Sequence, residues 1–225
     1  MKNKLLKILD NFKRKKILVI GDIMLDKYIW GDVVRISPEA PVQVVNVLRE
    51  TYEAGGAANV ANNISALSGD ALMVGITGND ESRKTLLEEL KKKGINTDGI
   101  FVDKDKPTTQ KVRILGKSQQ LLRVDYEKNE HIHGIIENSI IDFVEKNVKE
   151  IDVIVISDYA KGVLTPKVNK KIVDIATDVV PEPGKKDAEL KRYQPQSQSK
   201  YVLEINAGLA NLNNLKVGDT VNFEL

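Results

Sequence analysis

The stretch that decides the fold is Ile17–Asp22, which reads Ile-Leu-Val-Ile-Gly-Asp. Four consecutive apolar residues closed by a glycine and an acid are typical of a strand that is buried on both faces and ends in a turn. Two later runs have the same character, Ala71–Ile76 and Ile151–Ile156, and the last is closed by Ser157-Asp158. Helical patterns separate the three runs. This alternation predicts an α/β domain with a largely parallel sheet.

The predicted helices are marked by their first residues. One helix opens after the glycine pair 55–56, the next can be capped by Asp80, and a third carries an apolar stripe from Ile136 to Val148. The last opens at Thr165-Pro166, a cap followed by proline at the first helical position, and runs to about residue 176.

A different pattern occupies the segments from Tyr28 to Val47 and from Thr109 to Tyr126. Pro38 and Pro41 forbid a helix in the first, and short alternating runs surround them. The second reads as two strands joined by a turn at residues 116–118. We therefore expect a lid of β-strands that stands off the main sheet.

Composition and charge exclude several classes of function. The 225 residues include no cysteine, which removes disulfides and thiolate metal sites. With 34 basic and 32 acidic residues the net charge is +2, so no strong field favours nucleic acid or a membrane surface. The basic segment Met1–Lys16 has the spacing of a short amphipathic helix, and no apolar run approaches the roughly 20 residues of a membrane span. We expect a cytoplasmic protein with no nucleic-acid or membrane partner.

Candidate binding residues follow the predicted strands, because ligands in such sheets lie at the carboxyl ends of the strands. Asp22 and Asp26 can accept hydrogen bonds from sugar hydroxyls or can cap a turn. Asp158 and Lys161 can contact a substrate or pair with each other. The glycine pair 55–56 can bring helix N–H groups to a polar ligand or form an ordinary turn.

A metal site is not expected. The two histidines, His131 and His133, lie beside a probable helix start and lack acidic neighbours at metal-ligand spacing, so a solvated helix cap is the expected role.

Taken together, the motifs resemble the ribokinase-like, PfkB-type carbohydrate kinases, and among them the heptose-7-phosphate kinases. The similarity runs from about Ile17 to about Ala176. Five motifs occur in the family's order, and they are Gly21–Tyr28, Arg35–Val42, Gly55–Ala61, Gln119–Arg123 and Ser157–Gly162.

The resemblance implies a ribokinase-like parallel-sheet sandwich with a β lid. It also implies ATP-dependent phosphorylation of heptose 7-phosphate at C1 in lipopolysaccharide heptose biosynthesis, with ATP and Mg²⁺ as the family's cofactors. A homodimer formed through the lid is the implied partner. The residues implied to bind the sugar phosphate are Asp26, Gly55, Gly56, Asn59, Arg113, Gln119, Asp158 and Lys161.

The sequence departs from the family in one respect. The family's catalytic aspartate lies in a Gly-Ala-Gly-Asp-like motif in the C-terminal half, which also builds most of the ATP site. None of the Gly-Asp pairs here follows Gly-Ala or Gly-Thr; they begin at Gly21, Gly31, Gly69 and Gly218. No catalytic residue is therefore assigned, and nucleotide binding by this chain is not expected from its residues.

Two units are expected on this basis. Residues 1–176 form the N-terminal part of a kinase domain, truncated. Residues 177–225 form an unrelated tail, because Lys200–Gly208 and Leu215–Asp219 resemble part of a small mostly-β domain. Besides an enzyme fragment, the alternatives are a non-catalytic module that binds a sugar phosphate or dimerises, and a non-functional chimaeric fragment.

Overall fold

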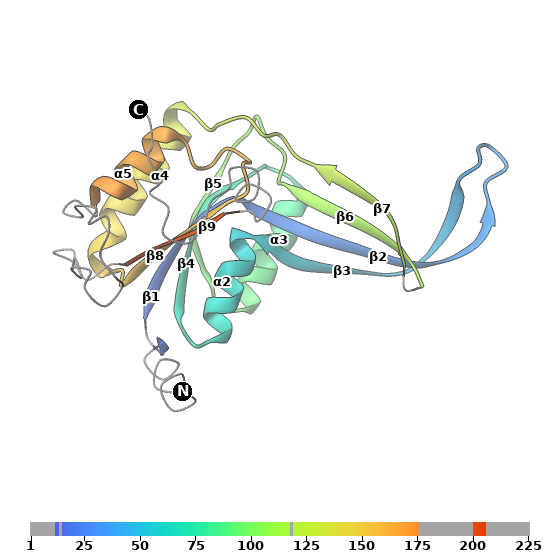
Figure 1. Ribbon diagram of the computed structural model, residues 1–225, viewed down its shortest axis with the longest axis horizontal. Coiled ribbons are helices and arrows are strands. Elements are labelled where there is room, and N and C mark those ends of the chain that lie inside the picture. Colours follow the sequence, from blue (N-terminus) through green and yellow to red (C-terminus); the bar gives the residue numbers. More distant parts are fainter. Residues whose placement is uncertain (1–11, 14, 118, 176–199, 206–225) are drawn as a thin grey trace, which may run out of the picture.

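Two β-sheets organise the chain in the computed structural model, which describes residues 12–13, 15–117, 119–175 and 200–205 (Figure 1). One sheet has the strand order β5-β4-β1-β8-β9 and the other β3-β2-β6-β7. The elements are β1 (Lys16–Gly21), β2 (Ile23–Ile36), β3 (Gln43–Gly56), α2 (Ala57–Ala66), β4 (Asp70–Thr77), α3 (Glu81–Lys92), β5 (Asn96–Val102), β6 (Gln110–Gly116), β7 (Gln119–Tyr126), α4 (Gly134–Asn147), a 3-10 turn (Val148–Glu150), β8 (Val153–Asp158), α5 (Pro166–Ile175) and β9 (Lys200–Ile205).

The five-stranded sheet is the body of the molecule, and all its pairings are parallel. The three apolar runs predicted as central strands are β1, β4 and β8, so that prediction is confirmed. On β1, Leu18 and Ile20 pack in the cluster that includes residues of α4 and α5. Ile17 and Val19 pack in the cluster that includes residues of α2 and α3. Helices therefore cover both faces, which is why the strand sequences are continuously apolar.

Strand β9 extends this sheet. It pairs in parallel with β8 from Val153 opposite Lys200 to Asp158 opposite Ile205. Order was expected to return at Tyr201, but within a separate mostly-β tail. The structure places this strand at the edge of the body sheet. The division of the chain at residue 176 remains a prediction.

The second sheet is the lid, the arm that extends away from the body in Figure 1. Strand β2 pairs antiparallel with β3 and parallel with β6, and β6 pairs antiparallel with β7. The predicted lid is confirmed, although it begins at Ile23 rather than Tyr28 and returns to Gly56. The sequence pattern did not assign the first residues of β2 to the lid, because Ile23, Met24 and Leu25 are apolar and buried like the residues of the core strands.

The lid and the body meet at the carboxyl ends of β1, β4 and β8. The chain passes from β1 to β2 through Asp22 alone. The N–H of Ala57 donates to the carbonyl of Asp22 at 3.0 Å, and the N–H of Asp103 donates to the carbonyl of Thr77 at 2.8 Å. These bonds bring the start of α2 and the loop before β6 to the same edge of the sheet.

Two remaining points concern the helices. The amphipathic helix expected over Met1–Lys16 lies mostly outside the described residues. Among the helices that the structure describes, none is long and apolar enough to cross a membrane.

Candidate functional site

Asp22 lies at the centre of the junction and is 1% exposed. Its Oδ2 accepts the N–H of Tyr159 at 2.8 Å and that of Lys161 at 3.0 Å. Its Oδ1 accepts the N–H of Val163 at 3.2 Å. Burial raises the pKa of this carboxyl above its ordinary value, and the backbone donors oppose the shift. Of the two roles left open for Asp22, the structure shows the one that holds a turn.

The loop after β8 is shaped to deliver alternate N–H groups to Asp22. Ala160 and Gly162, between the donors, have positive φ values of 56° and 96°. A Cβ at Gly162 would overlap the carbonyl of Glu130, so only glycine fits there. The loop is thus a concave arrangement of N–H groups, of the kind that binds anions, and the Asp22 carboxylate occupies it.

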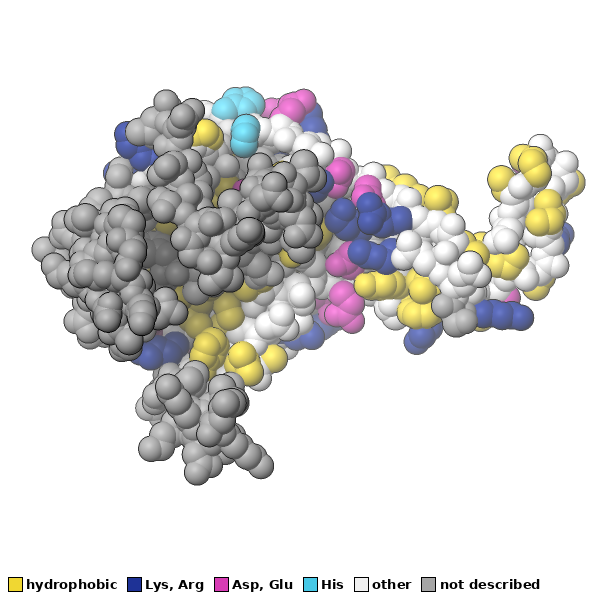
Figure 2. Space-filling view, in the orientation of Figure 1, with side chains coloured by type: hydrophobic (Ala, Val, Ile, Leu, Met, Phe, Trp, Pro, Cys, Tyr) yellow, Lys and Arg dark blue, Asp and Glu magenta, His cyan; other side chains and the backbone are white. Residues whose placement is uncertain are grey.

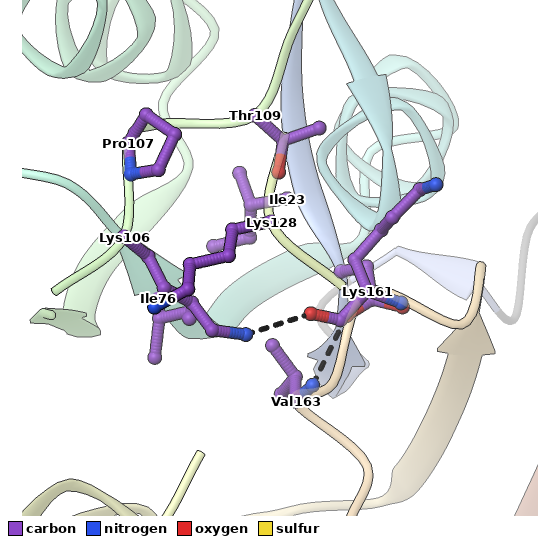
Figure 3. Close-up of a pocket in the computed structure, with 9 residues that line it drawn as sticks. Ile23, Ile76, Lys106, Pro107, Thr109, Lys128, Lys161 and Val163 are labelled. Carbon is purple, nitrogen blue, oxygen red and sulfur yellow. Dashed lines mark hydrogen bonds between the residues drawn. The ribbon is translucent and has the colours of Figure 1, made fainter. Parts of the chain in front are cut away.

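Lys106 reinforces the same loop from the other side. It is 8% exposed, and its ammonium donates to the carbonyls of Lys161, at 3.0 Å, and Glu130 (Figure 3). Burial lowers the pKa of Lys106, and the nearby Asp103 and Asp22 carboxylates oppose that shift. Lys106 therefore helps to fix the backbone around Lys161.

Asp26 and the glycine pair form the second part of the site. Asp26, on β2, is ion-paired with Arg113 on the neighbouring strand β6. A Cβ at Gly55 would overlap the Asp26 carboxylate, so this carboxylate lies directly over the glycine backbone. Gly56 has a φ of 57°, and a Cβ there would overlap the carbonyl of Asp22. Close approach therefore requires both glycines, and at Gly56 the backbone conformation requires glycine as well.

Helix α2 begins at this point, and the N–H of Ala57, its first residue, donates to the carbonyl of Asp22 at 3.0 Å. Gly56 is its N-cap and makes no side-chain capping hydrogen bond. Asn59 lies in the first turn and its side chain is exposed. An uncapped helix start next to a carboxylate offers both donors and acceptors, which suits a polyhydroxylated ligand.

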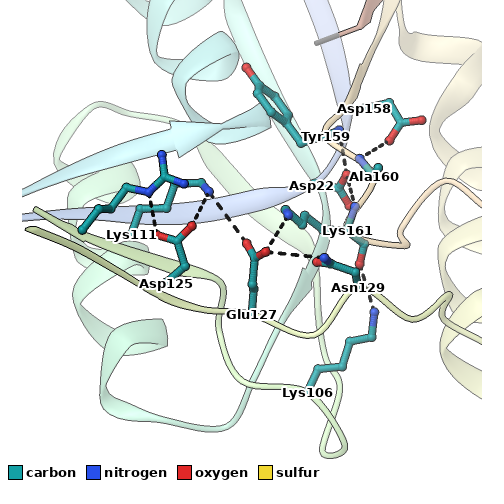
Figure 4. A network of polar contacts seen from close by, with 11 residues as sticks. Asp22, Lys106, Lys111, Asp125, Glu127, Asn129, Asp158, Tyr159, Ala160 and Lys161 are labelled. Carbon is teal, nitrogen blue, oxygen red and sulfur yellow. Dashed lines mark hydrogen bonds and ion pairs between the residues drawn. The ribbon is translucent and has the colours of Figure 1, made fainter. Parts of the chain in front are cut away.

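A charged network joins the lid to the body (Figure 4). The Lys161 ammonium lies 2.9 Å from Oε1 of Glu127, which follows β7. Lys111, on β6, lies 3.2 Å from Oδ2 of Asp125 and 3.7 Å from Oε2 of Glu127. Burial pushes the pKa of Glu127 upward, but Lys161 and Lys111 outweigh it and hold that pKa below its ordinary value. Figure 2 shows these charges gathered where the arm leaves the body.

The structure places the residues predicted to bind the sugar phosphate in three separate regions. Asp26, Arg113, Gly55 and Gly56 are brought together, with Asn59 one helical turn away.

Asp158 and Lys161 lie in the loop that Asp22 holds. Asp158 accepts the N–H of Ala160 at 2.8 Å. Lys161 forms an ion pair with Glu127 rather than with Asp158. Gln119 is exposed at the far end of the β6–β7 hairpin, paired with Gly116, and is not brought to the others.

Two contributors, Lys106 and Glu127, were not predicted, whereas the turn-holding role of Asp22 was one of its two expected roles. Lys106 stands in an ordinary-looking charged stretch, Lys104-Asp105-Lys106. Its burial depends on contacts with residues 24 and 55 positions away, which no local pattern shows.

Within the described ranges, no group of three His, Cys, Asp or Glu side chains is placed to hold a metal ion. The side chains of this region offer hydrogen bonding and charge pairing to a ligand.

A parallel α/β body, a β lid and a glycine-opened helix beside a lid carboxylate define a ribokinase-like protein. The chain belongs to the pfkB family of carbohydrate kinases, whose family model matches residues 14–216. A sugar kinase crystal structure from Clostridium perfringens shares the fold, with a TM-score of 0.55 at 17% identity over 85% of this chain and 51% of that one.

Curated relatives are similar in sequence as well. The Bifunctional protein HldE of Wolinella succinogenes is 45% identical over 169 residues, covering 75% of this chain and 36% of the relative. The protein of the same name from Helicobacter pylori strain HPAG1 is 37% identical over 212 residues, covering 92% and 45%. The chain therefore spans less than half the length of these relatives. The family match and the alignment with the second relative both extend past residue 176. They give no support to the expected second, unrelated family in residues 177–225, which remains a prediction.

Proposed function

We propose that this chain supplies the sugar side of an ATP-dependent kinase that phosphorylates heptose 7-phosphate at C1, in lipopolysaccharide heptose biosynthesis. The observation that carries the proposal is the Asp26 carboxylate lying over Gly55, beside the uncapped start of α2. Family membership and the similarity to the HldE proteins support a sugar as the ligand. Because such a kinase uses ATP, we place it in the cytoplasm.

Each residue has a role in this proposal. Asp26 accepts hydrogen bonds from sugar hydroxyls, and Arg113 fixes its orientation through their ion pair. Of the N–H groups at the start of α2, those after Ala57 donate to sugar oxygens, and the Asn59 amide adds a donor and an acceptor. Asp158 and Lys161 contact the sugar from the loop after β8. When Lys161 is drawn to an anionic substrate, it leaves Glu127, and this exchange would couple binding to the lid.

A second candidate function is binding of the sugar phosphate without turnover. It is favoured by the sequence, in which no Gly-Asp pair follows Gly-Ala or Gly-Thr. General-base activation of the attacking hydroxyl is worth about 10²–10⁴-fold, so its loss would abolish useful activity.

A homodimer formed through the lid fits either function. Large apolar side chains are exposed near the end of the arm, including Val34, Ile36 and Leu48 at 64%, 60% and 69%.

Calorimetric titration with heptose 7-phosphate tests the sugar site. Asp26→Asn should weaken binding at least about tenfold, or roughly 1.4 kcal/mol, because the acceptor loses its charge. Asn59→Ala should weaken it less. Asp32→Asn is the matched control, since it makes the same change further along β2 and should leave the affinity unaltered. Equal affinity of wild type and Asp26→Asn would refute the site. Gln119→Ala tests whether the end of the lid reaches the sugar.

A coupled assay with ATP, Mg²⁺ and heptose 7-phosphate separates the two functions. Turnover that disappears in Asp26→Asn would establish the enzyme in this chain. Binding without turnover would establish the second candidate.

A further inference from the structure

The lid face that carries Asp26 is arranged in rows, because residues paired across neighbouring strands point to the same side of a sheet. In the inner row, Asp26 on β2 pairs with Lys111 on β6, which pairs with Asp125 on β7. The charges alternate as negative, positive and negative. Lys111 offsets one of the two carboxylates, since its Nζ lies 3.2 Å from Asp125 Oδ2, and the negative charge of Asp26 remains within the row.

The next row outward breaks that alternation. Tyr28 pairs with Arg113, and Arg113 pairs directly with Arg123. Like charges placed directly opposite on neighbouring strands are destabilising. Each arginine is ion-paired with a carboxylate of the inner row, Arg113 through Nη1 with Asp26 and Arg123 through Nε with Asp125 at 3.0 Å. A guanidinium carries five N–H donors, so most of them remain for another acceptor.

An aromatic ring contacts one of these two cations. The Arg113 guanidinium lies 5.3 Å from the centre of the Tyr28 ring, and Tyr28 stacks on Trp30 with centroids 6.3 Å apart. Arg49, on β3, lies 4.7 Å from the centre of the Trp30 ring. Stacking on a ring face favours a cation and restricts its rotamers. Arg113 is therefore partly oriented before any ligand arrives.

The face looks toward the candidate sugar site. Figure 4 shows Glu127 reaching the Lys161 ammonium, at 2.9 Å, with Lys111 and Asp125 beside it. Arg113 and Arg123 lie two positions from Lys111 and Asp125 on their strands and so share that side. Two residues of strand rise about 6–7 Å, which sets the separation between the two rows.

We propose that Arg113 and Arg123 form the subsite for the phosphate group that the sugar already carries, while Asp26 in the next row binds its hydroxyls. This inference rests on the proposed function and deepens it. A phosphate accepts hydrogen bonds from both guanidinium groups and relieves the repulsion between them. The paired arginines select a phosphorylated sugar over the free sugar. Arg123 is the more accessible of the two, because its side chain is 50% exposed.

The test is calorimetry with three ligands, namely heptose 7-phosphate, the same heptose without phosphate, and inorganic phosphate. Wild type should bind the sugar phosphate at least tenfold more tightly than either of the others. Arg123→Gln should remove most of that preference and leave the affinity for free heptose unchanged. The matched control is Arg35→Gln, which removes the same charge from an exposed position further along β2.

Each contrary outcome has a distinct meaning. Equal affinity of wild type for heptose with and without phosphate overturns the subsite and leaves the sugar site standing. Loss of preference in Arg35→Gln as large as in Arg123→Gln shows a general charge effect and also overturns the subsite. Inorganic phosphate binding as tightly as the sugar phosphate overturns it in favour of a free-anion site. If wild type binds neither sugar, the proposed function fails and the subsite fails with it.

Discussion

The body and the lid are both β-sheets, but they are stabilised by different means. On β1, at the centre of the body, Ile17 to Ile20 are at most 3% exposed, and helices cover both faces. In the lid, large apolar side chains such as Leu48 and Leu122 are 69% and 54% exposed, and ion pairs and ring contacts run along one face. The body is held by burial, which is strong and non-directional. The lid is held by strand pairing, and its partly exposed ion pairs add little stability and can be replaced by a charged ligand.

This difference assigns the two sheets different tasks. The body fixes the positions of the loop after β8 and the start of α2 through bonds such as those to the buried Asp22 carboxylate. The lid is joined to the body at one end, and one of its faces carries charged and aromatic side chains. Substitutions in the body should therefore lower the free energy of unfolding, whereas substitutions in the lid should change how the protein responds to its ligand.

The largest expected effect is a cavity in the body. Leu18 is 0% exposed, so Leu18→Ala should lower the free energy of unfolding by about 2–5 kcal/mol. Leu122→Ala in the lid is the matched control, and its effect should stay within about 0.5 kcal/mol because the side chain is exposed. Thermal melts of the two variants compare them directly. Equal losses of stability would mean that the lid is held by burial as well.

A loss of comparable size is expected where the two regions join. Asp22→Ala removes the acceptor of three buried N–H groups, those of Tyr159, Lys161 and Val163. Leaving them unsatisfied should cost about 3 kcal/mol or more in the free energy of unfolding. Asp158→Ala removes the acceptor of one local N–H and should cost less than about 1 kcal/mol. Chemical denaturation that ranks these two variants in the opposite order would exclude Asp22 as the holder of the loop.

The smallest effect on stability should come from the contact between the lid and the body. Glu127→Gln removes the ion pairs with Lys161 and Lys111 and should change the free energy of unfolding by less than about 1 kcal/mol. Hydrogen exchange of β6 and β7 should nevertheless become faster, because the lid opens more often.

The pH dependence of that exchange provides a check on its cause. The pKa of Glu127 lies below its ordinary value of 4.5, so its ion pairs stabilise the closed lid fully above pH 4.5 and are lost as the pH falls through the lowered pKa. Lid opening in wild type should therefore increase below pH 4.5, with a smaller increase in Glu127→Gln. The same increase in both proteins would assign the effect to other carboxylates.

Much of this fold follows from the sequence, and the reasons for the failures are physical. The apolar runs predicted β1, β4 and β8 because a strand buried on both faces has few other sequences available to it. Pro38 and the alternating runs around it predicted the lid.

Strand β9 was not placed in the body sheet, because the apolar run in Lys200–Ile205 indicates a strand but not the strand with which it pairs. The rows of charge on the lid depend on strand register, which the sequence does not reveal.

The candidate site was predicted only in part for a related reason. Gly55 and Asp26 stand at positions where local patterns carry information, a helix start and a strand end. The burial of Lys106 and the pairing of Glu127 with Lys161 depend on segments far apart in the chain, so only the structure reveals them.

The central claim is that one ligand is bound between the end of the body sheet and the lid face that carries Asp26. Hydrogen exchange measured with and without heptose 7-phosphate tests it most directly. Without the sugar phosphate, the lid strands β2, β3, β6 and β7 should exchange faster than β1, β4 and β8. With it, exchange should slow in the lid strands, at the start of α2 and in the loop after β8, and should stay unchanged in α4. Protection confined to the body helices, or no change in the lid at a saturating concentration, would contradict the account.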